Sequence, residues 1–332
     1  MFRPYLNTIG RHKRILEIGP LANPMVPKAE DMDVFYADIR SIEEIKDFYK
    51  NDNSVDKNKI VDIDYVIKDT YSGSLKNVKQ FDYVIMSHVI EHIPRIIDFF
   101  FDISNILKSS GKLCLTIPDK RYCFDHYRCP TSFAECYDIY RRGVTNNPLR
   151  VLDHCVSWTI NDPVFWWGNP SDYENIPKDD ARFAEALSNY DSALTGNYHD
   201  VHFNVFTPET FLLLIYNLTK SFLFPFEIVE FYGTDKDTFE FNVVLKNRLL
   251  APPKEGSKSF QEDRIRACDQ LLVLLKNNSD LEELNRLKYE LEMANEKIQY
   301  LQQRLEDVFL SRSWRITGPL RSFSKFIMGN KK

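Results

Sequence analysis

The stretch RILEIGPLANP, residues 14–24, decides how the first part of the chain folds. Its apolar run is typical of a short buried strand, and the strand ends at a turn that begins with Gly19. Glu17 lies two positions before this glycine. A dinucleotide-binding turn needs G-x-G-x-x-G, because the backbone must approach a pyrophosphate closely. Here Leu21 takes the place of the second glycine, so the stretch alone is either an altered nucleotide-binding turn or an ordinary strand end.

Strand and helix patterns alternate along the chain as far as about residue 118. Short apolar or β-branched runs predict strands, and amphipathic runs with helical spacing predict helices between them. The predicted strands cover residues 14–19, 33–39, 63–68, 81–87 and 111–118, and the predicted helices cover residues 41–50 and 95–107. Ser41 is placed to cap the first of these helices. This alternation predicts an α/β fold with a parallel sheet covered on both faces.

A long irregular segment, residues 119–205, interrupts the alternation. It is rich in aromatic and polar residues, and we expect it to be a loop-rich insertion that caps the substrate. After it, TPETFLLLIYNLTK (207–220) predicts a helix that begins at a threonine cap. Residues 226–233 and 238–247 predict an antiparallel pair of strands. We therefore assign residues 1–250 to one domain that contains the insertion.

The composition changes after residue 250. We expect residues 251–278 to form a linker and a short helix, and residues 279–310 to form a coiled coil. In the second segment Leu284, Leu291, Ile298 and Leu305 recur every seven residues. One long helix packed against the body is the alternative. The heptad pattern favours self-association through the coiled coil, as a dimer or a trimer.

Residues 311–332 contain basic residues interleaved with bulky apolar ones, and no acidic residue. This pattern fits a basic amphipathic tail that contacts an anionic membrane surface. A disordered tail or a peptide that binds a protein partner fits the pattern equally well, because Gly318 and Pro319 interrupt any helix.

The bulk composition narrows the classes of function. The net charge of -5 gives no reason to expect a nucleic-acid partner. The sequence contains no run of about 18 apolar residues and no apolar signal segment near its first residue, so we expect a cytoplasmic protein. Its six cysteines form no C-x-x-C pair, which favours reduced thiols.

Polar residues lie at the ends of the predicted strands, where ligands bind in an open α/β sheet. Asp38 follows Gly19 by 19 residues, at the position where a carboxylate can accept both ribose hydroxyls of a nucleoside. The candidate cofactor-binding residues are Glu17, Gly19, Pro20, Asp38, Asp69, Ser87 and His88. Each residue alone is more simply a turn or a solvated strand end, but their order and spacing together favour a nucleoside site. The altered turn disfavours a pyrophosphate, so a ligand without phosphates fits better.

At this point the sequence resembles a known family. The motifs LEIGPLANP (16–24), ADIRS (37–41), FDYVIMSHVIEHIP (81–94) and GKLCLTIPDKRYCFD (111–125) resemble those of class I S-adenosylmethionine-dependent methyltransferases. The resemblance implies a Rossmann-like seven-stranded sheet with the strand order 3-2-1-4-5-7-6, and S-adenosylmethionine as the cofactor. It also implies that Asp38 binds the ribose and that Gly19 lies beside the methionine moiety.

Three further motifs narrow the resemblance. LDH (152–154) and DVHFNVFTPETF (200–211) are similar to methyltransferase domains encoded in bacterial surface-glycan gene clusters. SRSWRITGPLR (311–321) after a coiled coil resembles the tails of enzymes that assemble O-antigen and related polysaccharides. The resemblance implies a sugar or glycan substrate, a glycosyltransferase partner and a position at the inner face of the plasma membrane.

Transfer of a methyl group to a hydroxyl also requires removal of the hydroxyl proton. We expect His154 to be the general base, with His202 as the second candidate and Asp119 or Asp153 as the orienting carboxylate. Each histidine is as readily a structural hydrogen-bonding residue of the cap. Asp200 and His202 alone are a poor ligand set, so we expect no metal ion. The rival functions are methylation of a small metabolite, a non-catalytic scaffold in glycan assembly, and an NAD-dependent sugar-modifying enzyme.

Overall fold

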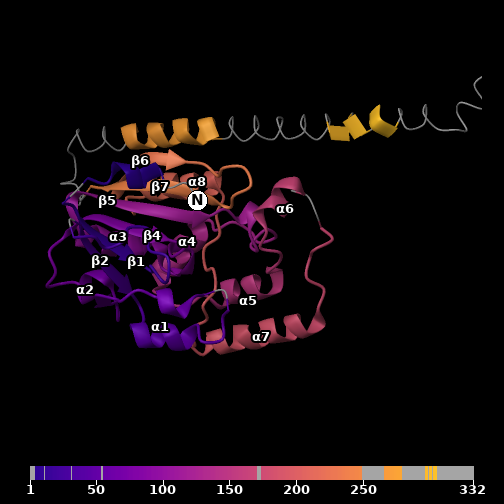
Figure 1. Ribbon diagram of the computed structural model, residues 1–332, viewed down its shortest axis with the longest axis horizontal. Helices are drawn as coiled ribbons and strands as arrows, with labels where there is room; N and C mark the ends of the chain where they lie inside the picture. The colour runs from indigo at the N-terminus through magenta and orange to yellow at the C-terminus, as the bar shows by residue number, and fades with distance from the viewer. Residues whose placement is uncertain are drawn as a thin grey trace, which may run out of the picture. The chain divides into compact units, whose positions relative to one another are not determined.

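The computed structural model describes residues 4–10, 12–30, 32–53, 55–169, 173–248 and 265–278, together with residues 296–297, 299–300 and 302–304 (Figure 1). The chain divides into two compact units, Met1–Lys276 and Asn277–Lys332. The first unit contains the sheet and every residue of the candidate site. The predicted coiled coil, residues 279–310, and the basic tail, residues 311–332, lie outside the described residues apart from the short helical pieces named above.

A seven-stranded sheet forms the centre of the first unit. Its strands are β1 (Arg14–Ile18), β2 (Asp33–Asp38), β3 (Tyr65–Val66), β4 (Phe81–Ser87), β5 (Leu107–Pro118), β6 (Phe226–Tyr232) and β7 (Glu240–Asn247). Their order is β3-β2-β1-β4-β5-β7-β6, and β7 runs antiparallel to both of its neighbours. This arrangement confirms the strand order that the sequence resemblance implied, including the antiparallel last pair.

Helices cover one face of the sheet. α3 (Ile96–Ile106) and α8 (Pro208–Lys220) bring their apolar sides onto alternate residues of β1, β4, β5 and β7. The helix of residues 265–278 adds Leu271 to the same core. Phe100 and Ile215 are completely buried there. Burial of such side chains contributes roughly 1.5–3 kcal/mol each to folding.

The opposite face of the sheet is covered by a 3-10 turn and by loop segments. The residues that pack on it come from a 3-10 turn, η1 (Pro4–Thr8), and from loop segments that include Val26 and Val61. The connection between β1 and β2, residues 19–32, contains no helix in its described part. Its three prolines explain this, because proline lacks the amide hydrogen that a helix interior requires. The sequence correctly indicated an α/β fold whose sheet is covered on both faces, and on this face the cover comes from a turn and loops.

Local capping signals fix the helices that the sequence predicted. α1 (Ile42–Phe48) begins after Ser41, which forms a reciprocal capping box with Glu44. Thr207 caps α8 in the same way. A short helix, α2 (Tyr71–Ser74), follows β3 and is capped by Thr70. The short turns η2 (Lys57–Lys59) and η3 (Ile90–His92) complete the sheet domain.

The segment between β5 and α8 is more regular than predicted. It contains η4 (Lys120–Tyr122), α4 (Phe133–Arg142), α5 (Pro148–Ser157), α6 (Pro163–Gly168) and α7 (Asp180–Leu194). Helix-start signals were present but not used: Ser132 with Glu135, and prolines in the first turns of α5 and α6. The prediction of a loop-rich insertion was therefore wrong. We call residues 119–206 the cap.

The two ends of the cap lie side by side at the end of β5. Asp119 and Phe206 form a parallel β-bridge, and the amide of Lys120 donates to the carbonyl of Phe206 at 2.8 Å. Within the cap, Val151, Ala193 and Phe203 belong to a small separate core between α5 and α7. The cap thus returns to the carboxyl end of the sheet just before α8 begins.

Among the described residues, no helix is both long enough and apolar enough to cross a membrane.

Candidate active site

Glu17 holds the turn that follows β1. Its carboxylate is buried and accepts hydrogen bonds from the backbone amides of Met25 at 2.6 Å and Val26 at 2.9 Å. Burial raises the pKa of Glu17 to about 7, although the two amide hydrogen bonds favour its ionised form. This geometry supports a role for Glu17 in orienting the loop.

Gly19 is required by the backbone of this turn. Its φ angle is +71°, and its amide donates to the carbonyl of Ala37 at 2.9 Å. A Cβ atom at this position would lie 3.0 Å from Cγ2 of Val89. Pro20 is buried directly after it, and Leu21 also has a positive φ angle, +46°. The turn is therefore tightly constrained even though it lacks the further glycines of a dinucleotide site.

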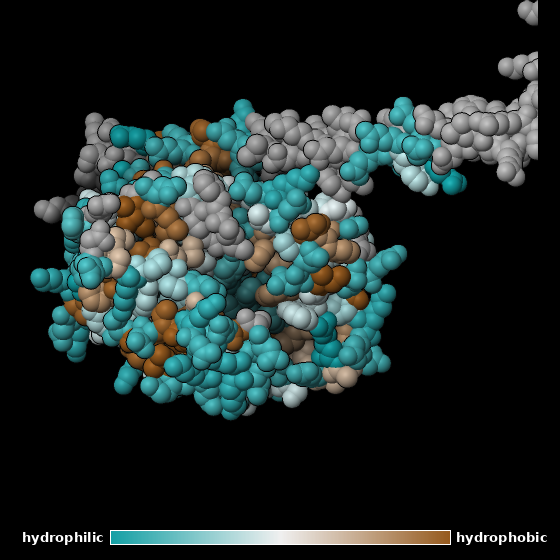
Figure 2. Space-filling view, viewed as in Figure 1, coloured by the Kyte–Doolittle hydropathy of each residue, from teal (hydrophilic) through white to brown (hydrophobic). Residues whose placement is uncertain are grey.

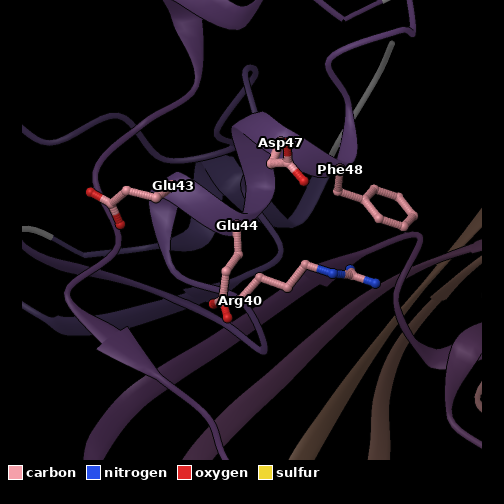
Figure 3. A pocket seen from close by; sticks show the side chains of 5 residues that line it. All are labelled: Arg40, Glu43, Glu44, Asp47 and Phe48. Atoms are coloured by element: carbon pink, nitrogen blue, oxygen red, sulfur yellow. The ribbon is translucent and has the colours of Figure 1, made fainter.

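Asp38 lies at the end of β2 in the position that the sequence predicted. Its carboxylate accepts a hydrogen bond from the amide of Arg40 at 2.9 Å, and burial raises its pKa. An open pocket of about 410 Å³ lies along α1, lined by Arg40, Glu43, Glu44, Asp47 and Phe48 (Figure 3). The guanidinium of Arg40 lies 4.1 Å from the centre of the Phe48 ring. A carboxylate at the end of the second strand has the position that binds a ribose in nucleotide-binding sheets.

The remaining predicted cofactor residues are placed less uniformly. Asp69 is exposed between β3 and α2. Ser87 ends β4 and is half-buried. His88 follows with a φ angle of +54°, and its Nε2 lies 2.5 Å from Oε1 of Glu240 on β7. Burial lowers the pKa of His88, but the carboxylates of Glu240 and Glu91 outweigh burial and raise it to about 9.

Glu91 is completely buried on η3, directly beyond β4. Neither of its carboxylate oxygens has a hydrogen-bond partner among the described residues. Oε1 lies 3.4 Å from Nδ1 of His88 and 4.0 Å from Nε2 of His202. Burial raises the pKa of Glu91, but the neighbouring histidines His88, His202 and His92 outweigh burial and hold it below its ordinary value.

Asn204 fixes the cap against η3. Its side-chain amide donates to the carbonyls of Ile90 and Ile93, and its backbone amide donates to the carbonyl of Glu91. These three hydrogen bonds place His202, two residues earlier, beside Glu91. The order of residues along the chain does not reveal this junction.

His202 is oriented by Asp125. Nδ1 of His202 lies 2.5 Å from Oδ2 of Asp125, whose other oxygen accepts from the buried Arg128 at 2.8 Å. Burial raises the pKa of Asp125, but His202 and Arg128 outweigh burial and hold it far below its ordinary value. Asp125 therefore stays ionised and fixes the imidazole, the orienting role that the sequence assigned to Asp119 or Asp153.

Asp153 and Asp119 have other partners. Oδ2 of Asp153 accepts from Nε of Arg128 at 2.9 Å and lies 3.4 Å from Nη1 of Arg150. Asp119 is fully buried and accepts hydrogen bonds from Arg121 and from the Thr234 hydroxyl. Both carboxylates thus hold the cap together.

His154 lies close to His202 but in a different electrostatic setting. The centres of the two rings are 5.8 Å apart, and Nδ1 of His154 is 3.4 Å from Nη1 of Arg128. Burial, with the charges of Arg128 and His202, lowers the pKa of His154 to about 3. A group with this pKa is neutral at pH 7 but is a weak base.

Residues 198–200 bring the cap close to the cofactor residues. Oδ1 of Asp200 lies 3.0 Å from Nδ1 of His92 and accepts from the Tyr198 hydroxyl at 3.2 Å. The negative charge of Asp200 also raises the pKa of Asp38, so the two carboxylates influence each other. Figure 2 shows this face hollowed between the sheet domain and helices α5 to α7 of the cap.

The aromatic residues of the cap divide into two groups. Trp166 is completely buried and stacked on His126 at 3.8 Å, so it belongs to the core of the cap. Trp158 and Tyr198 are 43% and 51% exposed and present ring surface to solvent, although the guanidinium of Arg182 lies 5.4 Å from the centre of the Trp158 ring. Such ring surfaces are suited to the apolar side of a sugar ring.

Sequence comparison identifies the domain. Residues 22–115 match a family model described as a methyltransferase domain. Together with the strand order 3-2-1-4-5-7-6, the match shows that the chain carries a class I methyltransferase domain, with S-adenosylmethionine as its cofactor. No curated protein sequence matches the chain.

Solved structures with similar folds include methyltransferases from three organisms. An S-adenosylmethionine-dependent methyltransferase from Methanosarcina mazei is 14% identical, covering 74% of this chain and 98% of its own, with a TM-score of 0.35. One from Aquifex aeolicus is 10% identical, with 71% and 82% covered and a TM-score of 0.32. The CcbJ methyltransferase from Streptomyces caelestis is 9% identical, with 73% and 92% covered and a TM-score of 0.36.

Proposed function

We propose that this enzyme transfers the methyl group of S-adenosylmethionine to a sugar hydroxyl of a cell-surface glycan or its precursor. The observation that carries the proposal is the polar cluster of Glu91, His92, Asp125 and His202. It lies beyond the carboxyl end of β4, where the cap meets the cofactor edge of the sheet. A hydroxyl acceptor needs such groups, because it must lose a proton during methyl transfer.

The chemistry is a displacement at carbon. A bond forms between the acceptor oxygen and the methyl carbon while the carbon–sulfur bond breaks, and the sulfur keeps the bonding electron pair. The hydroxyl proton passes to a base. We place His202 before His154 as the group that faces this proton, because Asp125 orients His202 and the pKa of His154 is about 3. Asp119 and Asp153 support the cap rather than the base.

Two features favour a sugar acceptor. The exposed faces of Trp158 and Tyr198 lie on the cap, and the motifs in residues 152–154 and 200–211 resemble those of surface-glycan methyltransferases. Methylation of a small metabolite is the main alternative. A non-catalytic scaffold is the second alternative, since it would use the same fold without methyl transfer.

Cofactor binding is the first test. We expect Asp38→Ala to weaken S-adenosylmethionine binding at least tenfold in calorimetry, because the substitution removes the ribose ligand. Asp191→Ala, an exposed carboxylate on α7, is the matched control and should bind like the wild type. A wild-type protein that does not bind the cofactor would exclude the catalytic function.

Acceptor identity is the second test. The full chain is incubated with S-adenosylmethionine labelled in its methyl group and with one of three acceptor classes: nucleotide sugars, lipid-linked oligosaccharides or small hydroxylated metabolites. Label transfer to a sugar hydroxyl supports the proposal. Transfer to the metabolites alone would replace it with the main alternative.

The C-terminal residues suggest how the enzyme assembles and where in the cell it acts. We propose that residues 279–310 mediate self-association and that residues 311–332 dock the enzyme at the inner face of the plasma membrane or on a glycosyltransferase. The basic charge of the tail supports this, because anionic lipids attract Lys and Arg. Replacing Arg312, Arg315 and Arg321 by Glu in the full chain should abolish flotation with anionic vesicles. Unchanged flotation would contradict membrane docking.

A further inference from the structure

We propose that Glu91, His92 and His202 form a binding site for one divalent transition-metal ion. Each residue offers one ligand atom, and these three atoms lie within 4.8 Å of one another. Glu91 and His92 are neighbours on η3, whereas His202 comes from the cap. The fold therefore assembles a different set from Asp200 and His202, the pair that we judged from the sequence to be a poor ligand set.

Within the described part of the chain, the carboxylate of Glu91 is buried without the hydrogen-bond partners that such a group needs. Its side chain is completely buried, yet neither carboxylate oxygen has a hydrogen-bond partner among the described residues. A buried carboxylate without partners is costly, and proteins normally pair such a group or use it to coordinate a metal. The nearest cationic group is His88, but Nδ1 of His88 is 3.4 Å away and its Nε2 is already paired with Glu240. A cation close to Glu91 would supply the missing partner.

The orientation of His202 also supports a metal site. Nδ1 of His202 is held by Asp125 at 2.5 Å, and Nδ1 of His92 lies 3.0 Å from Asp200. In His202 a carboxylate occupies the Nδ1 side and leaves Nε2 toward Glu91. In His92 the Nδ1 contact with Asp200 lacks the geometry of a hydrogen bond. Metal-binding histidines show the pattern seen in His202, because the carboxylate fixes the ring and increases the basicity of the coordinating nitrogen. The pair of His202 and Asp125 therefore directs one imidazole nitrogen toward the buried carboxylate of Glu91.

The distances require only a local contraction. Ligands about 2.0–2.2 Å from one ion lie roughly 3.0–3.5 Å from one another. Nε2 of His202 is 4.0 Å from Oε1 of Glu91, and the three ligand atoms lie within 4.8 Å of one another, so their separations must shrink by roughly 0.5–1.8 Å. Asn204 already holds the backbones of η3 and the cap together.

The donor set selects the class of ion. Two imidazole nitrogens and one carboxylate suit Zn²⁺, Fe²⁺, Co²⁺ or Mn²⁺, whereas Mg²⁺ and Ca²⁺ prefer oxygen ligands throughout. Three protein ligands leave further coordination positions open. His92 is 31% exposed, so the open positions face the solvent side of the cluster.

The role of the ion rests on the proposed function, whereas its binding does not. Two adjacent hydroxyls of a sugar can occupy the open positions of such an ion. The bound hydroxyl becomes more acidic and releases its proton to water, as metal-bound water does. With the ion bound, water replaces His202 as the proton acceptor proposed above. His202 is then a metal ligand that its hydrogen bond to Asp125 orients.

The test measures metal binding in the absence of any methyl acceptor. Untagged full-length protein is treated with a chelator and then titrated with Co²⁺, whose visible absorption reports nitrogen coordination. We expect one Co²⁺ per chain, and competition by Zn²⁺ but not by millimolar Mg²⁺. Glu91→Gln and His202→Asn should each weaken Co²⁺ binding at least 100-fold. Asp200→Asn, which removes only the carboxylate behind His92, should weaken it about tenfold.

Two further variants serve as controls for the metal site. His154→Asn alters a neighbouring histidine that is not a ligand, and it should leave Co²⁺ binding unchanged. If Glu91→Gln does not fold, the partly exposed His92→Asn takes its place. Absence of Co²⁺ binding by the wild type, or equal loss in His154→Asn, would overturn the site. A chain that binds Co²⁺ but methylates no sugar would refute only the proposed acceptor.

Discussion

The two sides of the candidate site are assembled in different ways. On the cofactor side, partners are close along the chain: the carboxylate of Glu17 and the amide of Met25 are eight residues apart. On the acceptor side, His202 and Asp125 are 77 residues apart, and Glu91 meets His202 only because the cap returns to the sheet. The cofactor side therefore follows from strand ends and turns, while the acceptor side depends on how the whole cap folds.

The two sides also differ in the number of ionised groups that they bury. The cofactor turn is held by one carboxylate and by backbone hydrogen bonds, so few ionised groups leave water. The acceptor side buries Asp125, Arg128 and Glu91 together. A network of this kind stabilises the fold only while every member keeps its partners. We therefore expect the acceptor side to respond more strongly to single substitutions than the cofactor side.

The largest effect is expected at Arg128. Arg128→Ala removes one buried partner of Asp125, which keeps its hydrogen bond with His202, and removes the main partner of Asp153. Loss of one partner of a buried ion pair costs about 3–5 kcal/mol, and we expect the free energy of unfolding in denaturant to fall by this amount. Arg142→Ala breaks an exposed pair with Asp138 and should change stability by less than about 0.5 kcal/mol. Similar losses of stability in both variants would show that the buried network contributes no more to stability than the exposed pair.

An intermediate effect is expected at Glu17 and depends on pH. Its folded-state pKa of about 7 lies above the ordinary 4.5, so its contribution to stability is fully present below pH 4.5 and is lost as the pH rises through 7. The loss corresponds to roughly 3 kcal/mol. Glu17→Gln does not titrate, so the stability of the wild type relative to this variant should decrease between pH 4.5 and pH 8.

The measurement is thermal or denaturant unfolding of both proteins across this pH range. The comparison uses the change with pH and not the offset, because glutamine also alters the hydrogen bonds to Met25 and Val26. Glu43→Gln, on the exposed side of α1, should follow the wild-type curve. Parallel curves for the wild type and Glu17→Gln would contradict the raised pKa.

The smallest of the three effects is expected at Gly19. Gly19→Ala meets two penalties: a positive φ angle, which costs roughly 1–2 kcal/mol, and a Cβ atom 3.0 Å from Val89. Gly143→Ala has a similar φ angle of +67° but open space around the new methyl group, so it measures the backbone penalty alone. Val89→Ala in the Gly19→Ala background should recover the difference between them.

Cofactor affinity separates this prediction from a general loss of stability. Gly19→Ala should weaken S-adenosylmethionine binding in calorimetry, because the methyl group displaces the turn. Gly143→Ala, on the far end of α4, should leave the affinity unchanged. Equal affinities in the two variants would show that the turn does not shape the cofactor site.

Much of the sheet domain could be predicted from the sequence. The strands follow apolar runs, and Ser41 and Thr207 mark the helix starts where the structure has them. The strand order came from the resemblance of motifs. Asp38 was placed correctly at a strand end because β2 ends where its apolar alternation ends. Such features depend on neighbouring residues, which is why the sequence reveals them.

The acceptor side could not be predicted in the same way. His154 and His202 were chosen by residue type, but their environments depend on Arg128 and Asp125, whose distances from them are set by the packing of the cap. The adjacency of Glu91 to His202 arises from the hydrogen bonds of Asn204, and no local pattern encodes it. The helices of the cap begin at capping residues and first-turn prolines that stand within an aromatic and polar composition typical of loops.

The bridge between Asp119 and Phe206 makes the cap an insertion at a single point of the sheet. Segments whose two ends lie together can be lengthened or exchanged without moving the elements that flank them. Acceptor preference in this fold is therefore open to replacement by the transfer of one continuous piece of sequence, while β5 and α8 keep their places. The constraint on such an exchange is narrow, since the incoming segment must again deliver residues equivalent to His202 and Asn204 beside η3.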